Sequence, residues 1–148
     1  MSQDTADLPE SDVLEFDERV LANLSDFVPL PFDDVADERR HRKERLVGGL
    51  RILAKRGLRT GLAGHVTVRD PEHADRFWVN PISVPFGQMR VSDLLLVNHD
   101  GEVLEGEMPL NQAAFALHSA IHKAFPVLNG ACHSHPPYGR TWSATGRR

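Results

Sequence analysis

Two histidines one residue apart, His133 and His135, stand in the stretch GACHSHPPYGR near the end of the sequence. Residues i and i+2 of a β-strand point to the same face, so the two imidazoles would project side by side if a strand ran through both. Neutral imidazole is a favoured ligand of zinc and other divalent transition metals. The spacing alone is compatible with a metal site, and equally with a chance pair in a chain of 8 histidines.

A second histidine pair precedes this stretch. His118 and His122 lie four residues apart in a segment that reads as a helix over residues 111–124, and side chains at i and i+4 share a helix face. For His122 the favoured interpretation is a half-exposed or internally hydrogen-bonded ring. The role of His118 stays open, because this helix leads directly into the HxH strand. The apolar side of the helix, which we expect to cover the core, consists of Leu117, Ala120, Ile121 and Ala124.

Other catalytic patterns fit the sequence less well. Cys132 is the only cysteine, which excludes an intramolecular disulfide, and it alternates in direction with His133 along a strand, so a Cys/His couple is not expected. We expect it to be a small core residue. The sequence contains no G-x-S-x-G, P-loop or dinucleotide fingerprint. The glycine-rich residues 57–65 precede a strand rather than a helix, so they either bring backbone N–H groups near an anion or simply connect two elements.

The elements that would position these residues can be read from periodicity and turn signals. A short helix is expected around residues 11–27 and a longer helix over 34–57. Strands are expected at residues 64–69, 76–81, 94–98 and 102–104, with a short buried strand at 128–134 before the HxH residues. The Asp100-Gly101 turn favours a hairpin. Strands between helices, joined by hairpins, predict α and β layers and exclude a purely parallel sheet.

Charge divides the chain into two parts. Residues 1–38 contain 12 acidic side chains and one basic side chain, whereas the rest of the chain is net basic. We therefore expect an acidic, partly disordered arm over residues 1–33 and one domain over 34–148. The basic balance could attract an anionic substrate, but without aromatic-basic interleaving nucleic acid is not expected. No secretory signal or membrane-spanning run is found, and a single cysteine fits the cytoplasm.

Four segments, in this order, resemble the class II aldolase/adducin family, and most closely its adducin-like bacterial branch. They are AGHVTVRDPEHADRFWVNP, VSDLLLVNHDGEVLEGE, NQAAFALHSAIHKAFP and HSHPPYGR, and the resemblance covers about residues 38–148. It implies a three-layer α/β/α sandwich with a mixed, largely antiparallel sheet. It also implies homo-oligomers, typically tetramers, and a zinc ion held by three histidines that acts as a Lewis acid on a sugar-phosphate substrate. His133 and His135 match the HxH ligands of the family.

The sequence departs from the aldolase pattern in the residues around that site. Where the aldolases have a Ser-Ser-Glu segment, this chain has residues 112–114, and Ala114 cannot transfer a proton. The family's Gly-Asn pair is Gly64-His65 here, and its Thr-Gly phosphate loop is Ile82-Ser83. The residues that could still line a substrate pocket are Gly64, His65, Asn80 and Ser83, and His118 is an additional candidate near the metal.

The third ligand histidine of the family has no counterpart in these 148 residues. Two histidines alone hold zinc weakly, so we expect a truncated product or fragment of the fold that is unstable in isolation. Two functions follow from the sequence. One is a metal-dependent, aldolase-like lyase for a hydroxylated carbonyl substrate, impaired in this form. The other is a non-catalytic, adducin-like binding or assembly module.

Overall fold

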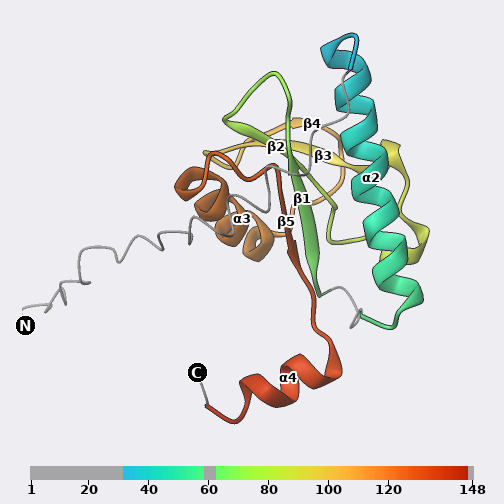
Figure 1. Cartoon of the computed structure of the whole chain (residues 1–148), viewed down its shortest axis with the longest axis vertical. Helices are drawn as coiled ribbons and strands as arrows, with labels where there is room; N and C mark the ends of the chain where they lie inside the picture. Colours follow the sequence, from blue (N-terminus) through green and yellow to red (C-terminus); the bar gives the residue numbers. More distant parts are fainter. Residues whose placement is uncertain (1–31, 59–62, 147–148) are drawn as a thin grey trace, which may run out of the picture. The chain divides into compact units, whose positions relative to one another are not determined.

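The computed structural model describes residues 32–58 and 63–146 (Figure 1). The expected helix near residues 11–27 and nearly all of the expected acidic arm lie outside these ranges. The described strands form a five-stranded sheet in the order β4-β3-β2-β1-β5, and each neighbouring pair is antiparallel. The strands are β1 (His65–Arg69), β2 (Arg76–Val79), β3 (Leu95–Asn98), β4 (Val103–Glu105) and β5 (Gly130–His133).

One face of the sheet is covered by helix α2 (Val35–Lys55), as the sequence predicts for residues 34–57. The helix begins at Asp34, whose carboxylate accepts a hydrogen bond from the Asp37 N–H at 2.7 Å, and such a cap satisfies a backbone donor that the helix leaves free. It ends before Gly57, whose φ of 69° suits a residue without a Cβ. The buried side chains of α2 and of the sheet face beneath it include Leu46, Val47, Leu50, Trp78 and Leu96.

The other face of the sheet is covered by helix α3 (Gln112–Ala124). Its first turn is capped by Asn111, whose side chain accepts hydrogen bonds from two backbone N–H groups. Ala114 is fully buried against the apolar residues of β2 and β3, namely Phe77, Val79, Leu95 and Val97. Figure 1 shows α2 and α3 on opposite sides of β1 and β5. The predicted three-layer α/β/α sandwich with a largely antiparallel sheet is therefore confirmed.

The prediction for the inward side of α3 is wrong. Leu117 is 44% exposed, and Ala120 and Ala124 are exposed as well. The buried positions of the helix are Ala114, His118, Ser119 and His122. The reason is that the part of the sheet facing this helix presents polar side chains from β1, and polar partners on α3 satisfy them.

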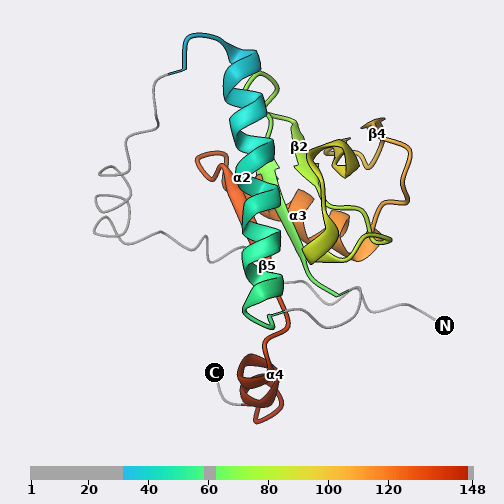
Figure 2. The ribbon, with the colours of Figure 1, turned by 90° about the vertical axis from the view of Figure 1, so that its right-hand side faces the viewer.

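The predicted buried strand before the HxH residues is an edge strand instead. β5 pairs with β1, and Gly130 and Cys132 are exposed. Cys132 is thus not a core residue, because β5 has a neighbour on one side only among the described strands. Beyond β5 the chain continues into helix α4 (Pro137–Ser143), which extends past the end of the strand in both views (Figures 1 and 2).

Candidate functional site

A layer of polar side chains lies between β1 and α3. Alternate residues of β1, namely His65, Thr67 and Arg69, face this layer and are only 4%, 1% and 6% exposed. Val66 and Val68 alternate with these residues along the strand. Both faces of β1 are in fact covered, because Val66 and Val68 pack against the α2 side. The polar face is the more deeply buried of the two.

Hydrogen bonds connect the imidazoles in this layer. His118 Nε2 lies 2.7 Å from His65 Nδ1, and His118 Nδ1 lies 2.6 Å from Thr67 Oγ1. The same hydroxyl lies 2.9 Å from His122 Nε2. Because the two α3 histidines are spaced i, i+4, both rings lie within hydrogen-bond distance of the same Thr67 hydroxyl group. For His122 this confirms the interpretation that its ring makes a polar contact inside the fold.

The HxH residues join this network at the β1–β5 pairing. His65 and His133 are direct partners in the antiparallel register, and His133 Nδ1 lies 3.2 Å from His65 Nε2. The strand ends at His133 and does not continue through His135, yet the two HxH rings remain 4.6 Å apart between centroids. The two predicted ligands therefore lie close together. We expected a continuous strand to place them on one face, but the strand ends at the first of them.

Burial keeps the rings of His65, His118 and His122 neutral at neutral pH. The pKa of His65, His118 and His122 is lowered to about 4, mainly by desolvation and to a smaller extent by neighbouring histidine and arginine side chains. The pKa of His133 is also lowered, first by burial and then by the nearby His135. A neutral imidazole has a free lone pair on one nitrogen, which is the form that ligates metals.

An open cavity of about 480 Å³ lies beside the HxH residues and is lined by His133, His135 and Arg140, among others. Gly64, the residue before β1, comes close to His133 with a φ of 98°. A Cβ added to it would lie 3.1 Å from the His133 carbonyl oxygen and 3.0 Å from the Phe86 ring. A larger cavity of about 580 Å³ lies along α2 and contains no histidine, so it offers no comparable chemistry.

The other predicted pocket residues are more scattered. Asn80 is 2% exposed, and its side-chain oxygen accepts a hydrogen bond from the Val66 N–H at 2.9 Å, so it connects two strands. Ser83 is exposed, and its hydroxyl contacts the sulfur of Met108 at 3.9 Å. His118 lies behind His65, and both of its ring nitrogens are already hydrogen bonded.

Thr67 is the functional candidate that the sequence alone did not identify. Its position two residues after His65 places both on one face of β1. Two histidines at i, i+4 in the helix that crosses this face are the signal that could have indicated a shared partner.

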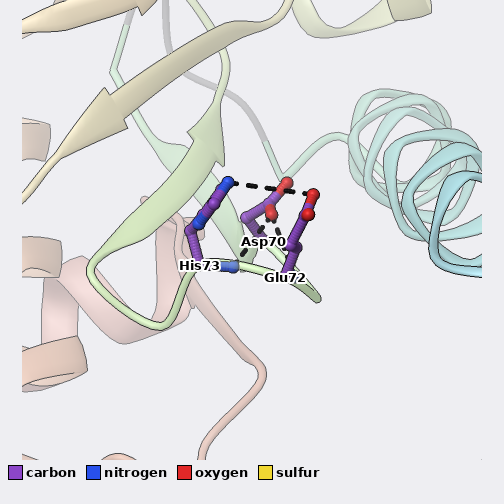
Figure 3. Close-up of side chains that lie close together, drawn as sticks. All are labelled: Asp70, Glu72 and His73. Atoms are coloured by element: carbon purple, nitrogen blue, oxygen red, sulfur yellow. Dashed lines mark hydrogen bonds and ion pairs between the residues drawn. The ribbon is translucent and has the colours of Figure 1, made fainter.

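Asp70, Glu72 and His73 form another cluster, at the turn after β1 (Figure 3). Within the ranges 32–58 and 63–146, it is the one group in which three metal-ligand atoms lie within 4.8 Å of one another. The Asp70 carboxylate, however, accepts hydrogen bonds from Arg39 at 2.7 and 3.0 Å and from Trp78 Nε1 at 3.1 Å. It also accepts from two backbone N–H groups of the turn. These contacts indicate a structural role for the cluster, which anchors α2 to the β1–β2 turn.

This anchor predicts a pH dependence of stability. Burial alone would raise the pKa of the Asp70 carboxyl, but the hydrogen bonds from Arg39, Glu72 N–H and Trp78 outweigh it and lower the pKa from 3.8 to about 2. Because the folded-state pKa lies below the unfolded one, the stabilisation is fully present above about pH 4 and is lost as the pH falls toward 2. We expect Asp70→Asn to lower the free energy of unfolding by about 2 kcal/mol at neutral pH.

The measurement is urea denaturation of both proteins at a series of pH values. The difference between wild type and Asp70→Asn should shrink as the pH falls from 4 to 2, because protonation removes the same charge. Asp75→Asn, a change at an exposed carboxylate, serves as the control and should not alter the pH profile. A difference that stays constant down to pH 2 would contradict the anchor.

Three layers around an antiparallel sheet, with an HxH pair at the end of its edge strand, define an α/β domain of the class II aldolase type. Residues 44–148 match the family described as the Class II Aldolase and Adducin N-terminal domain. The chain belongs to this family.

The relatives include proteins named for different activities. The chain is 43% identical over 122 residues to Decarboxylase NovR of Streptomyces niveus, covering 81% of this chain and 45% of the relative. It is 40% identical over 117 residues to the Meiotically up-regulated gene 14 protein of Schizosaccharomyces pombe, covering 78% and 46%. The structure of L-fuculose 1-phosphate aldolase from Glaciozyma antarctica PI12 is 47% identical with a TM-score of 0.79, covering 86% and 52%. The chain spans about half the length of these relatives.

None of the described helices is long and apolar enough to cross a membrane.

Proposed function

We propose that this chain forms the metal-binding part of a lyase active site, in which a carbon–carbon bond next to a carbonyl group of a hydroxylated substrate is broken. The observation that supports this most directly is the pair of adjacent imidazoles, His133 and His135, beside an open cavity, with His133 also in contact with His65. Two of the relatives are named a decarboxylase and an aldolase, and both names denote cleavage of a carbon–carbon bond.

The donor set fits a divalent transition metal, most readily zinc. Imidazole nitrogens are ligands that zinc prefers, and the two rings lie close enough to face one ion. When bound, the metal would supply Lewis-acid polarisation of the substrate's carbonyl and hydroxyl oxygens. A catalytic zinc site normally has three protein ligands, so we propose that a further ligand from outside the described residues completes it.

The surrounding residues would bind and orient the substrate. Arg140 lines the cavity and would pair with an anionic group such as a phosphate. Gly64 would let the segment before β1 pack closely against β5 at His133, because it has no side chain, and His65 would hold His133 in place. Asn80 would act indirectly by holding β1 against the segment after β2.

Ala114 favours a second candidate function. On the family resemblance it corresponds to the aldolase acid/base residue, and its methyl side chain, fully buried against the sheet, has no group that could transfer a proton. A non-catalytic, adducin-like binding or assembly module would keep the fold without this group. In both cases we propose a cytoplasmic homo-oligomer, with small molecules as ligands in the catalytic case.

Zinc binding tests the proposal. We expect calorimetric titration of the full chain to show one zinc ion per chain, and His135→Ala to weaken binding by about 100-fold or more, because a ligand is lost. His73→Ala serves as the control, since it changes a histidine of the Asp70 cluster, and it should bind zinc like the wild type. A folded protein without zinc affinity, or a loss confined to His73→Ala, would refute the site at His133 and His135.

A further inference from the structure

The face of helix α2 that points away from the sheet combines unpaired positive charge with an exposed aliphatic side chain. Figure 2 shows α2 at the front, with the sheet behind it. The outward residues follow one another at alternating intervals of four and three positions, so they form a single stripe along the helix. This stripe consists of His41, Arg45, Gly48, Ile52 and Lys55. The buried residues of α2, namely Leu46, Val47 and Leu50, lie on the opposite side.

Two cavities adjoin along the stripe. One of about 450 Å³ lies beside its N-terminal part, and one of about 580 Å³ lies beside its C-terminal part. They meet at Ile52, which lines both and is 61% exposed. Between the charged side chains the helix surface is low, because nothing lies within 4 Å of a Cβ added at Gly48 or Gly49. We call the stripe together with the two cavities the α2 groove.

The α2 groove has a net positive charge. The cations that line it are Arg45, Arg51 and Lys55. None of them forms a salt bridge with a residue in the part of the chain that the structure describes. The cations nearer the N-terminus of α2, in contrast, are each paired with a carboxylate; these are Arg39, Arg40 and Arg42. Glu44 is the one acidic residue that lines the groove, and the sequence has no further acid before Asp70.

These properties limit what can bind there. Unpaired cations attract an anionic partner and repel a second copy of the same groove. The exposed side chain of Ile52 requires an apolar contact as well, which the sugar-phosphate backbone of a nucleic acid does not offer. The absence of side chains at Gly48 and Gly49 allows another helix to approach closely, since two packed helices lie about 8–10 Å apart. An acidic, amphipathic helix has all three properties.

We propose that the α2 groove is the docking site for an acidic, amphipathic helical segment of another protein. The apolar side of that segment covers Gly48 and Ile52, and its carboxylates pair with Arg45, Arg51 and Lys55. Arg45 and Lys55 are separated by about 15 Å along α2, so the matching acids lie about three turns apart on the partner. This is the helix-in-groove mode of recognition. Neither His133 nor His135 lines the groove, so the inference is independent of the proposed metal site.

A designed peptide tests the proposal on the full chain. The probe is a fluorescent peptide of about three heptads, with leucine at the a and d positions and glutamate elsewhere. We expect fluorescence anisotropy to show micromolar binding at low salt, with affinity falling as salt screens the charges. A peptide with lysine in place of glutamate should not bind, and polyglutamate of the same length should bind about tenfold more weakly, because it lacks the apolar side. No binding of the probe, or equal binding of all three peptides, would overturn the proposal.

Three variants test whether the probe occupies the groove itself. Gly48→Leu places a side chain on the low surface of α2 and should weaken binding about tenfold or more by steric overlap. Arg45→Glu should weaken it about fivefold, because an attraction becomes a repulsion. Arg40→Glu changes the net charge equally but lies outside the groove, and it should leave the affinity unchanged. Circular dichroism confirms that each variant is folded, since Gly48 has open space around it.

The same variants exclude the other occupants. Equal losses in Arg45→Glu and Arg40→Glu would mean general attraction to a basic surface, and the groove would not be a docking site. A DNA duplex that binds more tightly than the probe and loses affinity in Arg45→Glu would assign the groove to nucleic acid. Self-association of the wild type that Gly48→Leu abolishes would assign it to a second copy. Each of these results would overturn the proposal.

Discussion

Arg69→Met should lower the free energy of unfolding by about 3–5 kcal/mol, because it leaves one buried and three partly buried carbonyl groups without this donor. The Arg69 guanidinium donates to the carbonyls of His122 at 2.8 Å and of Phe125 and Leu128 at 3.3 Å, and to that of Ala74. Two of these carbonyls lie at the C-terminal end of α3, where a cation also complements the helix dipole. Urea denaturation followed by circular dichroism measures the loss.

Arg45→Met is the matched control for this prediction. Arg45 is an exposed residue on α2, so the same chemical change should alter stability by no more than about 0.5 kcal/mol. Equal effects of the two substitutions would mean that the carbonyls around Arg69 are satisfied in another way. We also expect Arg69→Met to disturb the His122 ring, because the Arg69 guanidinium holds the His122 backbone carbonyl.

Gly64→Ala should destabilise the protein by about 2–4 kcal/mol and weaken zinc binding at the same time. The φ of 98° is unfavourable for a residue with a side chain. The new Cβ would also lie 3.0 Å from Phe86 Cζ and 3.1 Å from the His133 carbonyl oxygen. Relief of this contact must displace β5 at the residue that we propose as a metal ligand. Denaturation and zinc titration on the same samples would detect both effects.

For Gly48→Ala we expect the opposite effect, an increase in stability. Gly48 lies inside α2, and nothing lies within 4 Å of a Cβ added there. Because glycine is unfavourable in a helix interior, alanine should stabilise the protein by about 0.5–1 kcal/mol. If both glycine substitutions changed stability in the same direction, the close approach of Gly64 to β5 would not be the cause.

Elements with local signals could be predicted from the sequence. Asp34 and Asn111 begin the two long helices as caps, and Gly101, with a φ of 92°, occupies the expected turn between β3 and β4. Capping and tight turns depend on residues close together in the chain, so their physics is visible in the sequence. The three-layer fold followed from the order of these elements and from the family resemblance.

The interior of the site could not be predicted in the same way. Binary patterning assigns polar residues to the surface, but His65, Thr67 and Arg69 are buried because α3 supplies partners for them. Whether a buried polar group is satisfied depends on residues about 50 positions away in sequence. The exposure of Cys132 likewise depends on which strands pair with β5, and this is a property of the sheet rather than of the local sequence.

The pairing of His65 with His133 ties the proposed site to a local folding equilibrium. β5 is held in the described sheet by β1 alone, so it can open without unfolding the rest of the domain. An opening of this kind separates His133 from His65 and disrupts the proposed site. A shift of one residue in the β1–β5 register would turn His133 to the other face of the sheet. By mass action, a ligand that binds only the closed form must slow hydrogen exchange of the β5 amides. Ligand binding at the proposed site and the pairing of β5 with β1 are thus thermodynamically coupled.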